Sequence, residues 1–212
     1  MKNVVTVIDY GINNIQSVIQ AFNFIGVKTI VANKPSLLDN ATHIVLPGVG
    51  AFPEGMKKLK NLGLDRLIKE KAMQKVKILG ICLGMQMLFS RSYEHRLSEG
   101  LNLISGEILQ IKKKIDSLDR VPVIGWRKTL CIDSVNKNIL KGVLDQKLFY
   151  YLHSFHMIPK DKDNVIAYYK RGEERINAAI AYRNIWGVQF HPEKSGDIGL
   201  EFLKCFSNLD KD

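Results

Sequence analysis

Short apolar runs alternate with amphipathic segments along the first 82 residues. An apolar run bounded by turn residues is typical of a buried strand, and apolar residues at helical spacing predict a helix. Strands are predicted at residues 4–9, 27–32, 43–46 and 76–82, and helices at residues 13–25, 55–60 and 64–74. Strands that alternate with helices imply right-handed crossovers and a mainly parallel sheet with helices on both faces.

Beyond about residue 100 the pattern changes to apolar stretches separated by short polar or glycine-containing turns. The strands predicted there are residues 103–112, 121–132, 149–158, 165–171, 176–183 and 185–190, and a helix is predicted at residues 198–206. Strands joined by short turns pair in the antiparallel sense. We therefore expect one α/β domain over residues 1–212, with an open, mixed, mainly parallel sheet flanked by helices and an antiparallel-rich C-terminal half.

The composition and charge of the chain argue against several classes of protein. The net charge is +10, but the lysines are scattered and the one tight run, residues 112–114, has no interleaved aromatic residues, which argues against a nucleic-acid site. No apolar run reaches membrane-spanning length, and no secretion signal is recognisable. The three cysteines are widely spaced, which argues against a disulfide framework and a zinc site. We therefore expect a cytoplasmic protein with no metal, cofactor, nucleic acid or membrane partner.

One cysteine, Cys82, stands between two glycines in residues 80–84 (GICLG), where a predicted strand ends. A nucleophile on a sharp strand-to-helix turn needs this pattern, because the turn strains the backbone and the glycines let strand and helix pass closely. A free cysteine is otherwise most often a small buried hydrophobic residue. The remaining motifs favour a nucleophile.

A histidine and a carboxylate, His191 and Glu193, stand one proline apart after the strand predicted at residues 185–190. Histidine supplies a base near neutral pH, and a carboxylate that orients its ring completes a catalytic triad with a cysteine. The alternative interpretation is a solvated turn that ends a strand.

A glycine-rich loop at residues 46–52 (LPGVGAF) follows another predicted strand. Glycines allow the backbone angles that point N–H groups at a developing oxyanion. In the elbow architecture one donor comes from the residue after the nucleophile and another from a different loop. Leu83, with Val49 or Gly50, is therefore the predicted oxyanion hole.

These motifs, in this order, resemble the class I glutamine amidotransferases, and within that family they look like the glutaminase subunits of imidazole glycerol phosphate synthases. The matching segments are residues 8–11 with Asn14 and 17–18, then 46–52, 80–86, 125–126, 153–154 and 189–195. The resemblance implies a flavodoxin-like fold and hydrolysis of glutamine to glutamate and ammonia by a Cys82, His191 and Glu193 triad. It also implies that Gly50, Gln86, Ser154 and Phe155 bind glutamine.

The resemblance further implies a heterodimer in which a (β/α)₈-barrel synthase subunit receives the ammonia through a closed path. Trp126 and Lys194 are then interface or gate residues, although Trp126 also fits a core position. Four segments depart from the usual family pattern and lie near the expected partner face, namely residues 13–15, 101–106, 122–127 and 154–156. These departures leave the acceptor open between the histidine pathway and a paralogue that supplies ammonia for amidination of a nucleotide sugar in surface-polysaccharide biosynthesis.

Two other classes of function are compatible with the fold. A non-catalytic binding module on the same fold is expected to lose Cys82, His191 or Glu193, and all three are present. A free-standing cysteine hydrolase of another γ-glutamyl compound is expected to turn over without any partner.

Overall fold

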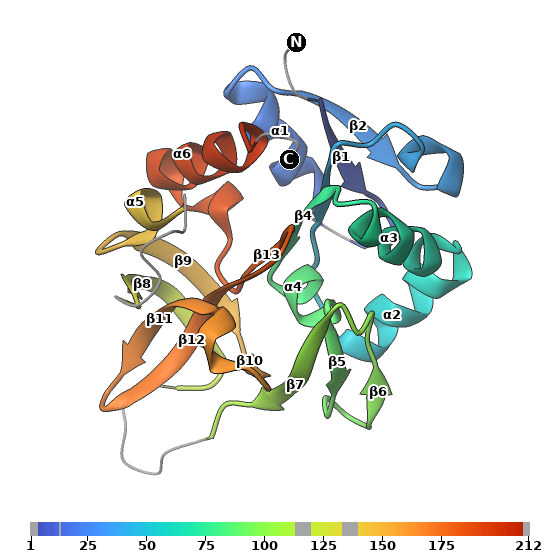
Figure 1. The fold of residues 1–212 in the computed structure, drawn as a ribbon. Helices are drawn as coiled ribbons and strands as arrows, with labels where there is room; N and C mark the ends of the chain where they lie inside the picture. The colour runs from blue at the N-terminus through green and yellow to red at the C-terminus, as the bar shows by residue number, and fades with distance from the viewer. Residues whose placement is uncertain (1–3, 13, 113–119, 133–139, 210–212) are drawn as a thin grey trace.

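The computed structural model describes residues 4–12, 14–112, 120–132 and 140–209. Within them, nine strands form one sheet in the order β2-β1-β3-β4-β13-β12-β11-β8-β9 (Figure 1). The first five strands in that order are parallel, and each later strand is antiparallel to its neighbour. The parallel strands are β1 (Val4–Ile8), β2 (Lys28–Ala32), β3 (His43–Leu46), β4 (Lys77–Ile81) and β13 (Ile185–Val188). The antiparallel strands are β12 (Glu174–Tyr182), β11 (Val165–Arg171), β8 (Val123–Cys131) and β9 (Leu148–His153).

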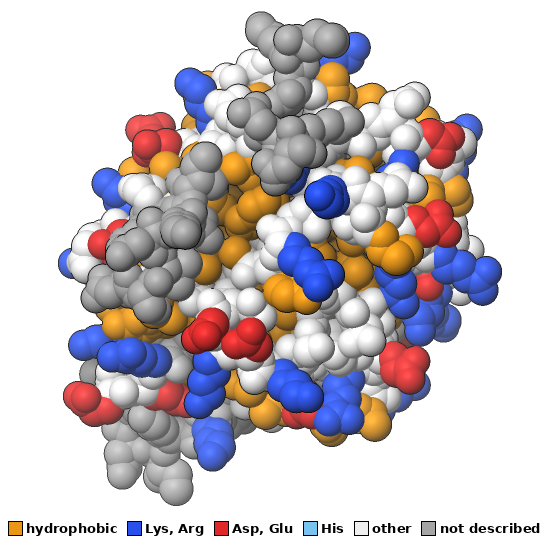
Figure 2. All heavy atoms as spheres, in the orientation of Figure 1, with side chains coloured by type: hydrophobic (Ala, Val, Ile, Leu, Met, Phe, Trp, Pro, Cys, Tyr) orange, Lys and Arg blue, Asp and Glu red, His pale blue; other side chains and the backbone are white. Residues whose placement is uncertain are grey.

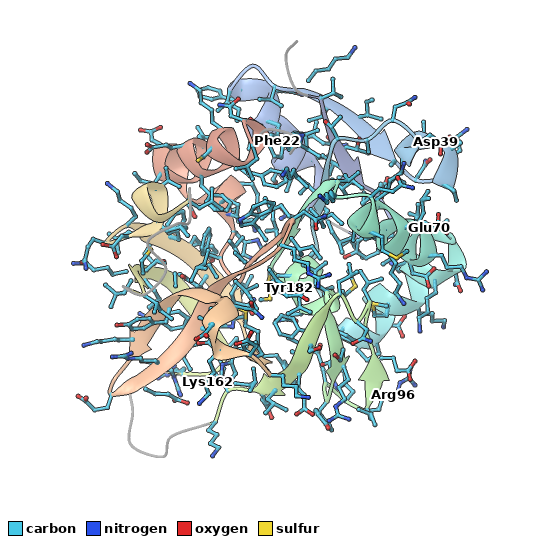
Figure 3. All side chains as sticks on the ribbon, in the orientation of Figure 1. Phe22, Asp39, Glu70, Arg96, Lys162 and Tyr182 are labelled. Atoms are coloured by element: carbon cyan, nitrogen blue, oxygen red, sulfur yellow. The ribbon has the colours of Figure 1, made fainter. Side chains whose placement is uncertain are left out.

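Helices cover both faces of this sheet because alternate apolar residues of the buried parallel strands point to opposite sides. On one side, Val18 and Phe22 of α1 and Phe202 of α6 join a core with Val5 and other strand residues. In Figure 3 Phe22 points into that layer. The other side is packed by apolar residues of α2, α3 and α4. The helices are α1 (Ile15–Phe24), α2 (Phe52–Asn61), α3 (Leu64–Met73), α4 (Leu83–Met87), α5 (Lys141–Leu144) and α6 (Gly196–Ser207).

A second, smaller sheet lies beside α4 and is separate from the main sheet (Figure 1). It has the order β10-β7-β5-β6. Its strands are β5 (Phe89–Ser92), β6 (Ser98–Glu99), β7 (Ile104–Gln110) and β10 (Phe155–Pro159), and the described 3-10 helices are η1 (Pro35–Leu38), η2 (Lys162–Asn164) and η3 (Pro192–Lys194).

The fold class expected from the sequence is confirmed, but one predicted strand is wrong. Residues 149–158 form two strands, β9 and β10, which are interrupted at Ser154 and belong to different sheets. The apolar pattern continues through the break, so it does not reveal it. The small sheet was not predicted as a separate unit, and α4 was not predicted because it is too short to show helical periodicity. Residue 13, the expected start of α1, lies outside the described residues.

The face of the molecule shown in Figure 2 mixes positive and negative side chains. In Figure 2 lysine and arginine side chains are distributed over the visible face, with acidic and apolar side chains between them. Arg96, labelled in Figure 3, lies in the exposed segment between β5 and β6, and the exposed Lys162 begins η2. None of the helices in the described residues is long and apolar enough to cross a membrane.

The contact between α4 and the loop after β3 yields a stability prediction. A Cβ atom on Gly84 would overlap the carbonyl oxygen of Leu46, which is backbone and cannot move aside. We expect Gly84→Ala to lower the free energy of unfolding by about 3 kcal/mol, as overpacked core substitutions do. The matched control is Gly142→Ala, because nothing lies within 4 Å of a Cβ there. Urea titration measures both, and equal stability of the two variants would contradict the prediction.

Candidate active site

Cys82 occupies the sharp turn between β4 and α4, with φ 52° and ψ −109°. A positive φ is uncommon for a residue with a Cβ and costs of order 1–3 kcal/mol, so the surroundings must hold it in place. They do so by close packing. The backbone N–H of Cys82 donates to the carbonyl of Val188 on β13 (2.8 Å), and a Cβ on Gly80 would lie 2.6 Å from the Cα of Met85. Gly80 and Gly84 are therefore both required, because neither position has room for a Cβ atom.

The parallel pairing of β13 with β4 brings the histidine to the cysteine. Val188 lies opposite Ile81 in the ladder, so the next residues of each strand, Gln189 and Cys82, leave the sheet side by side. Two residues further on, His191 is 1% exposed. Sequence motifs more than one hundred residues apart thus meet because of strand register.

Glu193 holds the histidine ring as the triad prediction requires. Its Oε1 accepts from Nδ1 of His191 (2.8 Å) and from Nδ2 of Asn14 (2.7 Å), and its side chain has no exposed surface. Within the described part of the chain, the other oxygen, Oε2, and Nε2 of His191 have no hydrogen-bond partner. Nε2 is therefore the ring nitrogen available for chemistry.

The environment of His191 favours its charged form. Burial by itself lowers the pKa, but interactions with Cys82 and Glu193 outweigh burial and raise the pKa to about 10. A hydrogen bond or negative charge beside an imidazolium stabilises the proton, which accounts for the sign. At neutral pH His191 therefore carries a proton, which is the state required of a general acid.

A cavity of about 200 Å³ opens beside the sulfur. It brings together eight of the residues predicted from the sequence, which are Val49, Gly50, Cys82, Leu83, Gln86, Ser154, Phe155 and His191. Pockets for drug-sized ligands have volumes of about 300–1,000 Å³, so this one suits a ligand the size of a single amino acid. Glu193 lies behind His191 and does not line it.

The predicted oxyanion donors are close to Cys82, but one of them is engaged. The N–H of Leu83 donates to the carbonyl of Gly48 at 3.3 Å. Because a trans peptide points its C=O and N–H in opposite directions, the N–H of Val49 faces away from Leu83. Tyr10 supports this loop by donating to the carbonyl of Pro47 (2.8 Å), and burial, with Cys82 nearby, raises the pKa of Tyr10 well above its usual value. Tyr10 is therefore a neutral donor.

A buried chain of hydrogen bonds runs from the backbone carbonyl of Phe155 to the sulfur of Cys82. The carbonyl of Phe155 accepts from Nδ1 of His153 (2.8 Å) and from Nε2 of Gln86 (3.2 Å). Nε2 of Gln86 also donates to Oε1 of Gln189 (3.1 Å), and Nε2 of Gln189 donates to Sγ of Cys82 (3.6 Å). Burial lowers the pKa of His153 to about 3, so this ring is neutral.

Sequence reasoning missed four residues of the site. Asn14, His153 and Gln189 stand inside motifs that carry the family resemblance, but no local pattern gives them a role. Glu94 lines the cavity, and its Oε2 accepts from the backbone N–H of Phe52 (2.7 Å). It lies in an irregular segment without periodicity, so no signal pointed to it. In the described residues no cluster of three or more His, Cys, Asp or Glu could hold a metal.

The two predicted interface residues are both outside the cavity. Trp126 on β8 is 50% exposed and packs edge-on against Tyr150 of β9, with ring centroids 6.1 Å apart. This excludes the core position considered for it. Lys194 ends η3 and is exposed.

Comparison with known proteins agrees with this geometry. The family described as glutamine amidotransferase class-I matches residues 6–206. The imidazole glycerol phosphate synthase subunit HisH of Lactococcus lactis is 42% identical over 207 residues, covering 97% of this chain and 98% of that protein. The subunit of the same name from Chlorobaculum tepidum is 37% identical over 206 residues, covering 97% and 100%.

Solved structures show the same fold. A structure described as PurLQS from Thermotoga maritima aligns with a TM-score of 0.72 at 20% identity, covering 98% of this chain and 99% of that one. Another, described as a glutamine amidotransferase, aligns with a TM-score of 0.73 at 14% identity, covering 95% and 98%.

The charge on Glu193 is expected to set the titration of His191. Glu193→Gln keeps the shape and removes the negative charge, so the His191 proton should be lost at a pH below the value of about 10 in the parent protein. Imidazole NMR titration measures this. His153 serves as the internal control, because it should stay neutral in both proteins down to about pH 3. An unchanged titration of His191 would mean that Cys82 alone holds the proton.

Proposed function

This chain belongs to the class I glutamine amidotransferase family, and we propose that it is the glutaminase subunit of an imidazole glycerol phosphate synthase, supplying ammonia for histidine biosynthesis. The observation that carries the proposal is the buried Cys82, His191 and Glu193 arrangement beside a cavity of amino-acid size, in a chain that aligns over nearly its full length with HisH subunits. The proposed glutaminase domain is residues 1–212, and the family match over residues 6–206 supports it.

In the proposed reaction the Cys82 thiolate attacks the side-chain amide carbon of glutamine. The carbonyl oxygen takes up the negative charge, and when the C–N bond breaks His191 gives its proton to the leaving nitrogen, which departs as ammonia. Neutral His191 then takes a proton from water, whose oxygen attacks the glutamyl thioester. Cys82 returns as a thiolate, His191 is again protonated, and the new carboxylic acid gives up the second proton of the water to solvent as glutamate leaves.

Glutamine recognition is assigned to the rest of the cavity lining. The carboxylate of Glu94 provides the negative charge that an α-ammonium group requires. Gly50 and the backbone around Ser154 and Phe155 are the proposed contacts for the remaining polar groups. Both N–H bonds of the Gln86 amide are directed to protein oxygens, so its own oxygen is the atom proposed to face the substrate.

An apolar face beside the cavity supports the proposed partner. Opposite residues in the β8–β9 ladder share one side of the sheet, and there Ile124 pairs with Leu152 and Trp126 with Tyr150. Ile124 is 56% exposed, Trp126 50% and Leu152 37%. Leu152 also lines the cavity. We assign this face, with Lys194, to a (β/α)₈-barrel synthase subunit in a heterodimer, where ammonia leaves the cavity without meeting bulk water.

The hydrogen bond that occupies the oxyanion donor of Leu83 fits a subunit that is inactive until its partner binds. The peptide between Gly48 and Val49 must rotate to release the N–H of Leu83 and to turn the N–H of Val49 toward the cavity. Hydrogen-bond donors that are aimed in advance at the oxyanion contribute several kcal/mol to catalysis. Low turnover by the isolated chain is the consequence.

A second acceptor fits the same half-reaction, namely a synthase that amidinates a nucleotide sugar in surface-polysaccharide biosynthesis. The residues that depart from the usual family pattern at 122–127 fall on or beside β8, at the proposed partner face. The cytoplasmic location expected from the cysteine spacing stays a prediction.

The nucleophile is tested by Cys82→Ala. We expect glutamine hydrolysis by the chain mixed with its synthase subunit to disappear, while Cys205→Ala, a half-buried cysteine on α6, keeps it. His191→Asn should lower kcat by about 10²–10⁴-fold, because proton transfer to the leaving group is lost. Turnover retained by Cys82→Ala would refute the mechanism.

The acceptor is tested by mixing. We expect the histidine-pathway cyclase subunit, with its nucleotide substrate, to raise glutamine hydrolysis strongly over that of the chain alone. Activation only by a sugar-amidinating synthase would assign the second acceptor, and full activity without any partner would indicate a free-standing hydrolase.

The docking face is tested by Trp126→Ala, which should weaken binding of the synthase subunit by about 2 kcal/mol, roughly 30-fold in Kd, as truncation of a central interface aromatic does. Phe24→Ala is the matched control, since Phe24 is 80% exposed on α1. Titration calorimetry measures both, and equal affinities would remove the β8–β9 face from the interface.

A further inference from the structure

We infer that Gln189 is a further catalytic residue, whose side-chain amide donates to the Cys82 sulfur, favours the thiolate over the thiol and is itself oriented by Gln86. This inference rests on the proposed role of Cys82 as nucleophile. Gln189 has no exposed surface and lies beside Cys82 because their strands are paired in register. Its Nε2 is 3.6 Å from Sγ, a donor-to-sulfur contact.

The direction of the Gln189 amide follows from a backbone carbonyl two side chains away. The oxygen of Phe155 can only accept, so the amide of Gln86 must present its nitrogen there. The same nitrogen, Nε2 of Gln86, is 3.1 Å from the side-chain amide of Gln189. Because this nitrogen donates, the atom of Gln189 that faces it must be the oxygen, Oε1. The nitrogen of Gln189 is then the atom directed at Cys82. One carbonyl thereby fixes which end of each amide points where.

A donor directed at the sulfur distinguishes the two forms of the cysteine. A thiolate only accepts hydrogen bonds, so an N–H group stabilises it relative to the thiol. The other contact of the sulfur has the opposite effect, because Sγ is 3.8 Å from the carbonyl oxygen of Leu152, which accepts from a thiol and repels a thiolate. Gln189 offsets this carbonyl.

Other groups also act on the sulfur. The imidazole of His191 comes from the loop after β13, with Glu193 behind it, the phenol of Tyr10 from the end of β1, and the carboxylate of Glu94 from the segment after β5. His191 favours the thiolate by its charge, and Glu94 disfavours it. Gln189 carries no charge, so its contribution to the thiolate persists when His191 loses its proton.

The test follows the iodoacetamide alkylation rate of Cys82 against pH, with the Cys82 peptide quantified by mass spectrometry so that Cys131 and Cys205 do not interfere. This readout needs neither glutamine nor a synthase. It therefore tests the role of Gln189 even if the proposed function proves wrong. Gln189→Met keeps the length of the side chain and removes the donor. We expect the pH midpoint of alkylation to rise by about one unit, a tenfold loss of thiolate at a given pH.

The matched control is Asn184→Leu, because Asn184 is a partly buried amide just before β13 whose Nδ2 donates to the carbonyls of Ala72 and Val76 and not to the sulfur. It should lower thermal stability without moving the alkylation midpoint. An unchanged midpoint in folded Gln189→Met, or an equal shift in Asn184→Leu, would overturn the inference.

Gln86→Met supplies the second test and remains decisive if Gln189→Met does not fold. Gln86 makes no contact with the sulfur in the hydrogen bonds described, yet its loss frees the Gln189 amide to turn, so the midpoint should again rise. In the double variant the two shifts should not add, because both act through one N–H group. Additive shifts, or no shift in Gln86→Met, would contradict the proposed chain.

Discussion

The parallel pairing of β13 with β4 is the constraint on which the site depends. It puts Val188 opposite Ile81, and from that single register the nucleophile, the base and the amide beside the sulfur all leave the sheet at one edge. A shift of one residue would turn every side chain of β13 to the other face. The glycines at positions 80 and 84 then allow α4 to lie against the strand ends so that Cys82 keeps its strained backbone.

Few groups compensate the buried charge in the site. One buried carboxylate, Glu193, is neutralised by the His191 ring and oriented by the Asn14 amide, so hydrogen bonds to a histidine and an amide keep its charge in the interior. Buried charges need this pairing because desolvation alone is costly. Cys82 and Glu193 together raise the pKa of His191 and keep it protonated, where burial alone would remove the proton.

The sequence predicted the parts of the site that are local and missed those that depend on distant chain segments. Cys82 and its glycines form one turn, and His191 and Glu193 form another, so each has a motif that can be recognised in isolation. The bond from Asn14 to Glu193 joins residues 179 positions apart, and no periodicity reports it. The break at Ser154 was missed for a related reason, since both β9 and β10 are apolar and only sheet membership separates them.

The place of β13 in the sheet also bears on how the protein is made. On a ribosome the N-terminal part of a chain emerges first, and long-range strand pairing is slow because loop closure must precede it. β4 and the Cys82 turn are synthesised first, whereas β13 and His191 are made more than one hundred residues later and only then pair with β4. The nascent chain therefore carries its cysteine without the histidine while more than one hundred further residues are made, and the completed triad reports that the segments between them have been made and folded.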